Sequence, residues 1–209
     1  GINHPYHAWF WISFVFVFLP SGESWKSRHT KRTYMMSYLT VFLAAQVMML
    51  LFYTLSGSWK IIYGITAMAQ GLDGVFSLRG LSYNLANRVL QTNTNPLLAE
   101  FAIDNYLLSW AGIMTIMYVQ FTAIVAAFRP RLHVLWGLVI AVFHFGTWLL
   151  MGIVFSHHIL LLMILFVMSP FRPARFDLRK TIMDLPIFGT IAGWLFNGFS
   201  KSPAVANVR

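Results

Sequence analysis

The sequence predicts an all-α protein: a polytopic transmembrane helical bundle of about five spans, with a helical cap segment on its outer side. Of its 209 residues, 58% are hydrophobic and only 10% are charged. The mean hydropathy of +0.65 exceeds that of ordinary soluble domains. Five apolar stretches approach or reach the roughly 20 residues that cross a bilayer, the first and last being short. They are residues 5–20, 33–55, 106–128, 134–154 and 157–171.

These stretches are expected to be helices rather than the strands of a barrel. A transmembrane strand has about ten residues of alternating polarity, whereas residues 47–52 and 159–166 are apolar without alternation. The chain has no cysteine, which excludes thiolate catalysis and cysteine-bound metals. The adjacent His157 and His158 would point about 100° apart on a helix, so they make no shared metal site by themselves. No metal site is therefore predicted.

The net charge of +9 is distributed as a membrane topology requires, not as a nucleic-acid surface. If the loop 21–32 is cytoplasmic, alternation of five spans places residues 129–133 and the tail after Phe171 on the same side. The positive-inside rule is then obeyed throughout. The N-terminus and the segment 56–105 lie outside, in a periplasm or lumen, and the lipid bilayer is the expected partner. The cytoplasmic segments carry 12 of the 15 basic residues: Lys26, Arg28, Lys31, Arg32, Arg129, Arg131, Arg172, Arg175, Arg179, Lys180, Lys201 and Arg209.

Two segments are neither plain loop nor plain span. Residues 59–105 combine four glycines with an Asn-Thr-Asn-Pro turn, which predicts short helices and turns packed at the outer surface. The apolar part of the basic tail, residues 187–199, is too short to span and is expected to be an interfacial helix or a docking surface. The predicted division is a transmembrane domain 1–171, which includes the outer segment 56–105, and a cytoplasmic tail 172–209.

Polar side chains inside apolar helices are costly and are candidates for function. Gln46 and Gln120 are expected to make interhelical hydrogen bonds. His144 lies near the middle of the stretch 134–154. Its two ring nitrogens suit either a structural bridge between helices or a chemical role.

Tyr53, Gly57 and Lys60 are spaced i, i+4, i+7 and share one face if the second helix continues past its apolar core. Two interpretations of Lys60 remain open. Its amine either reaches the head groups as an anchor at the helix end, or is desolvated and acts as a general base.

The ordered set Asn3-His4-x-Tyr6, Tyr53-Thr-Leu-Ser-Gly57-Ser-Trp-Lys60, Phe143-His144 and Gly-Ile-Val-Phe at 152–155 resembles the membrane domain of vitamin K-dependent gamma-carboxylase. More widely, it resembles the HTTM (horizontally transferred transmembrane) family. The resemblance runs from the N-terminus to about Phe171.

The resemblance implies a reaction and a site on the outer side. In that enzyme a vitamin K quinol is deprotonated and reacts with oxygen, and the resulting alkoxide removes a proton from glutamate before CO2 adds. Carried over, Lys60 corresponds to the base, Asn3 and His4 to the Asn-His pair near the reaction centre, and His144 to a histidine of a late membrane helix. Tyr53 and Gly57 would contact the cofactor, which would be vitamin K or another quinol.

Two functions from different classes follow. The helices that precede the Asn-His motif in the family are not present here, nor is the large extramembrane domain, and the lysine pair is Trp59-Lys60. The chain opens with Gly1 rather than methionine, which favours a processed chain or a piece of a longer one. The absent helices and the apolar tail favour an accessory or binding transmembrane subunit of a larger complex, with other membrane subunits as partners, whereas the Tyr53-Gly57-Lys60 line favours the alternative. The alternative is a gamma-carboxylase-like enzyme that oxidises a quinol with Lys60 as base.

Overall fold

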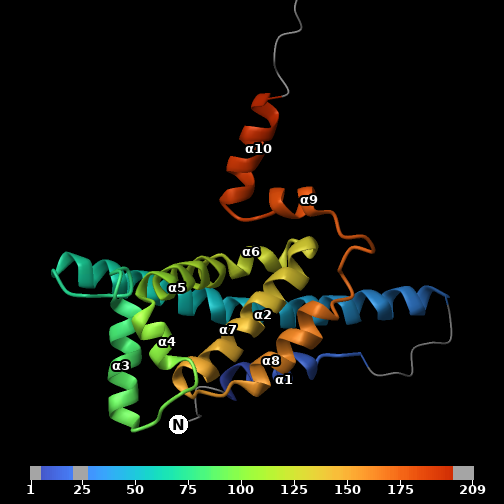
Figure 1. Cartoon of the computed structure of the whole chain (residues 1–209). Helices are drawn as coiled ribbons and strands as arrows, with labels where there is room; N and C mark the ends of the chain where they lie inside the picture. Colours follow the sequence, from blue (N-terminus) through green and yellow to red (C-terminus); the bar gives the residue numbers. More distant parts are fainter. Residues whose placement is uncertain (1–5, 21–27, 200–209) are drawn as a thin grey trace, which may run out of the picture.

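The expected helical fold is present in the computed structural model, which describes residues 6–20 and 28–199 (Figure 1). Within these residues there are helices, turns and no strand. A 3₁₀ turn Pro130–Leu132 precedes α7, and a π-helical turn Met163–Val167 continues α8. The α-helices are α1 His7–Phe16, α2 Arg28–Ala69, α3 Gly80–Thr92, α4 Ala99–Asp104, α5 Tyr106–Phe121, α6 Ala123–Ala127, α7 His133–Met151, α8 Ser156–Leu162, α9 Leu178–Met183 and α10 Phe188–Phe199.

Two helical segments of the described chain are long and apolar enough to cross a membrane. They are Lys31–Ala69, which is most of α2, and Pro130–Met151, which is α7 with the turn before it. Shorter apolar helices, His7–Phe16, Tyr106–Phe121 and Ser156–Val167, fall within or largely coincide with the other three predicted stretches. All five apolar stretches therefore contain helix, whereas the count of five spans stays a prediction.

Helix α2 is longer than the apolar stretch 33–55 suggests. It continues without a break to Ala69, so residues 59–69 extend α2 and do not belong to the turns expected from residue 59 onward. Continued packing against α5 explains the extension, because Gly57 lies directly on the α5 backbone. The expected short helices and turns begin at Gly71, which has a positive φ of 67°, and include α3 and α4.

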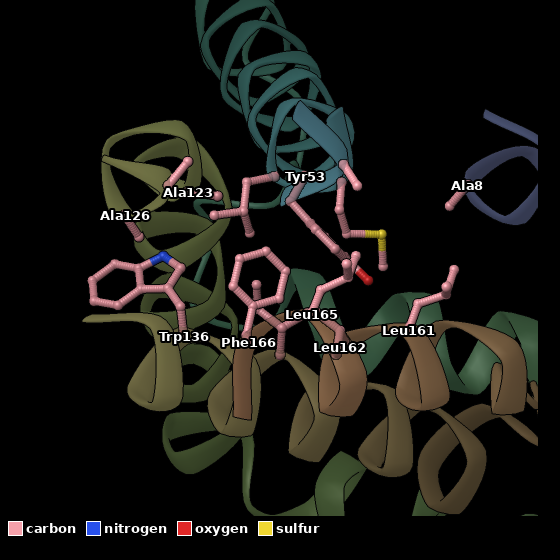
Figure 2. Packing of buried hydrophobic residues seen from close by; sticks show 14 of the residues in the cluster. Ala8, Tyr53, Ala123, Ala126, Trp136, Leu161, Leu162, Leu165 and Phe166 are labelled. Carbon is pink, nitrogen blue, oxygen red and sulfur yellow. The ribbon is translucent and has the colours of Figure 1, made fainter. Parts of the chain in front are cut away.

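Small residues let the central helices approach closely, as is common in membrane bundles. Ala123, Ala126 and Ala127 of α6 are fully buried beside α2. Figure 2 shows Ala123 and Ala126 with Tyr53, Trp136 and the apolar side chains of α8 in one core. The Trp136 indole N–H donates to the Val119 carbonyl at 3.1 Å, which satisfies the polar atom of the largest buried side chain.

A buried polar cluster joins α2, α7 and the end of the π-helical turn. The Gln46 amide donates to the Leu165 carbonyl at 2.5 Å and to the Ser169 hydroxyl at 3.0 Å, and Ser169 lies 2.9 Å from Nδ1 of His133. Nε2 of His133 contacts the Ala127 carbonyl at 3.1 Å. The predicted interhelical role of Gln46 is thereby confirmed.

The tail is attached through a few polar contacts, and α9 and α10 project from the remaining helices (Figure 1). Arg131 forms an ion pair with Asp184 at 2.9 Å, Arg129 donates to the Asp184 carbonyl, and the Tyr118 hydroxyl donates to the Pro186 carbonyl at 2.6 Å. The apolar segment 187–199 is helical as expected, since α10 covers nearly all of it. Its position at a membrane interface stays a prediction.

Candidate functional site

One face of α2 supplies the first half of the site. Tyr53, Gly57 and Lys60 lie one and two turns apart on a continuous helix and all contact α5 or α7. The face predicted from their spacing is therefore confirmed. This common face required the helix to continue past residue 55, and α2 does so.

Tyr53 and His144 form a buried pair between α2 and α7. The Tyr53 hydroxyl lies 2.6 Å from Nε2 of His144, and both side chains are less than 7% exposed. Nδ1 of His144 is buried and has no hydrogen-bond partner in the described part of the chain. The imidazole also packs against the rings of Phe155 and His158, with centroids 4.8 and 5.2 Å away. His144 is thus a bridge between helices that retains capacity for one further hydrogen bond.

The Lys60 amine is turned toward the protein. Its Nζ donates to Oε1 of Gln120 at 2.8 Å and to the Ser56 hydroxyl at 2.8 Å, and Gln120 is 2% exposed. The amine therefore points toward Gln120 rather than to the head groups, whereas its role as a general base stays a prediction. The interhelical role of Gln120 is confirmed. Both partners are neutral, so they satisfy donors of the amine without neutralising its charge.

Gly57 sets the distance between Lys60 and Gln120. A Cβ atom at this position would lie 2.6 Å from the Phe121 nitrogen and 2.9 Å from the Gln120 carbonyl carbon. Both atoms belong to backbone, which cannot rotate aside as a side chain would. Only glycine allows α2 and α5 to approach this closely, and the close approach brings Gln120 within reach of the amine one turn further along α2.

A polar cavity of about 530 Å³ lies beside these residues. The cavity is lined by residues of α1, α2, α5, α7 and the segment 153–158. Trp59 and Thr147 are among them, in addition to the hydrogen-bonding residues described above. The residues that line it are His7, Ala8, Met49, Phe52, Tyr53, Ser56, Trp59, Lys60, Gln120, Phe143, His144, Thr147, Met151, Ile153, Phe155 and His158.

A second cavity, of about 660 Å³, adjoins the first and is almost wholly apolar. It lies between α5 and α7 and is lined on another side by Leu81 of α3, by Phe101 of α4 and by Leu98, which precedes α4. Leu108 and Val142, which line it, are 62% and 68% exposed, so the cavity opens at the surface of the bundle beside exposed apolar side chains. Four residues line both cavities, which places Lys60 at their junction: Lys60, Phe143, Thr147 and Met151.

The predicted site residues are brought together only in part. Lys60, Tyr53 and His144 line the polar cavity. Gly57 does not line it but packs against the α5 backbone at Gln120 and Phe121. Asn3 and His4 lie outside the described residues, although His7 and Ala8 at the start of α1 line the same cavity.

Sequence reasoning did not assign Ser56, Trp59 or His158 to the site. Ser56 could have been predicted from its spacing, because Ser56 and Lys60 are one turn apart on α2 and therefore share a face of the helix. Gln120 was predicted to make a structural hydrogen bond between helices. Its partner is the Lys60 amine, which is itself a candidate site residue.

Comparisons with known proteins give no match: no protein-family model, no curated protein and no solved structure matches this chain. The resemblance to the HTTM family stays a hypothesis.

Proposed function

We propose that this protein is an integral membrane protein that binds a lipophilic ligand, with a hydrogen-bonding head in the polar cavity and an apolar tail in the apolar cavity. One observation carries the proposal: Lys60 stands at the junction of a cavity rich in hydrogen-bonding groups and one that is almost wholly apolar. Ligand sites typically combine a large apolar lining with a few placed polar groups. This role is one form of the accessory or binding function predicted from the sequence.

The proposed membrane topology has five spans. Its support is the two long apolar helices, the helix within each remaining apolar stretch, and the concentration of basic residues in the three segments assigned to the cytoplasm. In this topology the two cavities belong to the outer half of the bundle. The apolar cavity then opens toward lipid, so a lipophilic ligand can enter it from the bilayer.

Filling the apolar cavity tests the proposal. Gly146 of α7 lines this cavity, and a Cβ placed there meets no atom within 4 Å, so Gly146→Leu should fold while occupying space for the ligand tail. Displacing about two methylenes costs about 1.6 kcal/mol, or about tenfold in affinity. Gly193→Leu is the matched control, because Gly193 lies on α10, also in open space. Radiolabelled hexadecan-1-ol and the purified chain in detergent are suitable for the titration.

The expected result is an about tenfold loss for Gly146→Leu and no change for Gly193→Leu. Equal binding by the parent chain and both variants would show that the ligand does not occupy this cavity, and the proposal would be abandoned.

The second candidate function is quinol oxidation of the gamma-carboxylase type, with Lys60 as base. The observation that favours it is the common wall that brings the Lys60 amine and the Tyr53–His144 pair to one cavity. Lys60→Ala and Lys60→Arg should both abolish quinol epoxidation with the fold intact, because arginine keeps the charge but does not readily release its proton. Full activity of either variant, or no activity of the parent protein, would reject this function.

Docking to other membrane subunits remains the other form of the accessory role. Exposed aromatic side chains on α1, among them Phe10, Trp11 and Phe14, suit contact with lipid and with a neighbouring helix equally well.

A further inference from the structure

The charge of the Lys60 amine has no counterpart in the two cavities. Its hydrogen-bond partners, Gln120 and Ser56, are neutral. Among the described residues that line either cavity there is no aspartate or glutamate. The lining therefore contains one ammonium, neutral donors and acceptors, and three histidines, but no anionic side chain.

Lys60 is of intermediate exposure, and an ammonium that is partly removed from water without an opposite charge loses part of its hydration free energy. A ligand that brings a negative charge to this position offsets that cost, and a neutral ligand does not. Hydrogen bonds between ionised partners are also shorter and roughly twice as strong as neutral ones. The arrangement of charge thus selects among lipophilic ligands by the charge of their head group.

We propose that the ligand is a single-chain lipid with a carboxylate head, a long-chain fatty acid, whose head group pairs with the Lys60 ammonium while its chain occupies the apolar cavity. This inference rests on the proposed binding function and names its ligand class. The Ser56 hydroxyl, which now accepts from Lys60 and lines the same cavity, supplies a further donor for the second carboxylate oxygen.

A single carboxylate fits the available cations better than a phosphate does. Phosphate sites commonly use arginine or several cationic groups. The two arginines of the cap are engaged elsewhere, since Arg88 donates to the Met151 carbonyl at 2.9 Å and Arg79 lies over the Tyr106 ring at 5.0 Å. Neither lines either of the two cavities, so among the described lining residues Lys60 is the one lysine or arginine that would face the head group.

Three probes with one alkyl chain separate the possible outcomes: palmitate, hexadecan-1-ol and lysophosphatidate. Each is titrated against the purified full chain in the same detergent at pH 8. Palmitate is expected to bind about tenfold more tightly than hexadecan-1-ol, the difference between a charged and a neutral hydrogen-bonded head, and more tightly than lysophosphatidate. Equal affinities for palmitate and the alcohol would overturn the inference while leaving the binding function in place. Tighter binding of lysophosphatidate would overturn the carboxylate assignment. If no probe binds, the inference and the proposed function both fail.

Two variants connect the selectivity to Lys60. Lys60→Met removes the charge and keeps the chain length, and Gln120→Glu places a carboxylate 2.8 Å from the amine in the parent geometry, where it neutralises the charge internally. In both variants the ratio of palmitate to hexadecan-1-ol affinity should fall from about ten to about one. Lys180→Met, on exposed α9, should keep the parent ratio. Gel filtration and the unfolding temperature verify the fold. A ratio near ten in Lys60→Met would overturn the assignment.

Discussion

The Tyr53 hydroxyl lies 2.6 Å from Nε2 of His144, across the interface of α2 and α7 and between residues 91 positions apart in the sequence. The pair is buried, so neither side chain can exchange its partner for bulk water. It links two helices that both line the polar cavity, and the His144 ring also packs against Phe155.

Loss of this hydrogen bond should destabilise the bundle. Tyr53→Phe leaves Nε2 of His144 buried without its partner, and we expect a decrease of about 1 kcal/mol in the free energy of unfolding, within the range for hydrogen bonds between membrane helices. Titration with a denaturing detergent, followed by circular dichroism, measures it. Tyr63→Phe on the same helix is the control, because Tyr63 is exposed and should be silent. A Tyr53→Phe variant as stable as Tyr63→Phe would show that the pair contributes nothing.

The Gly57 contact should be intolerant of a single methyl group. Gly57→Ala would place Cβ 2.6 Å from the Phe121 nitrogen, so α2 and α5 must separate, and overpacking of this kind costs about 1–3 kcal/mol. The same separation would draw Gln120 away from Lys60 and weaken ligand binding. Gly112→Ala on α5 is the matched control for stability, because its Cβ meets nothing within 4 Å and alanine favours helix by up to about 1 kcal/mol. Equal melting temperatures for the two variants would contradict the contact.

The difference between what the sequence predicted and what it did not is a matter of distance along the chain. The apolar stretches identified the helices because membrane helices must bury their backbone polar groups within one segment. The common face of Tyr53, Gly57 and Lys60 followed from helical spacing alone.

The partners of these residues could not be predicted in the same way. His144 and Gln120 are separated from Tyr53 and Lys60 by whole helices, so their pairing depends on how α2, α5 and α7 cross. The continuation of α2 past Leu55 could not be predicted from the sequence either, because the serines and glycine of residues 56–58 have low helix propensity. Packing on α5 overrides this propensity.

The proposed topology predicts which segments a membrane-impermeant reagent reaches. Tags inserted in the segment 21–32, whose last five residues begin α2, and in the tail after residue 171 should be accessible from the cytoplasm only, and a tag after Gln91 from the outside only, because the basic residues are concentrated in the first two segments. Protease protection in spheroplasts or sealed vesicles measures this. A tail and a Gln91 tag exposed on the same side would contradict the five-span arrangement.

Photo-crosslinking can locate a bound alkyl chain in the protein directly. A palmitate analogue with a diazirine near the end of its alkyl chain is irradiated with the purified protein, and the labelled residues are identified by mass spectrometry. We expect labels on the walls of the apolar cavity, around Ile113 and Ile116 of α5 and Leu138 and Val142 of α7, and their loss in Gly146→Leu. Labels confined to the outer face of α1, unchanged in Gly146→Leu, would contradict it.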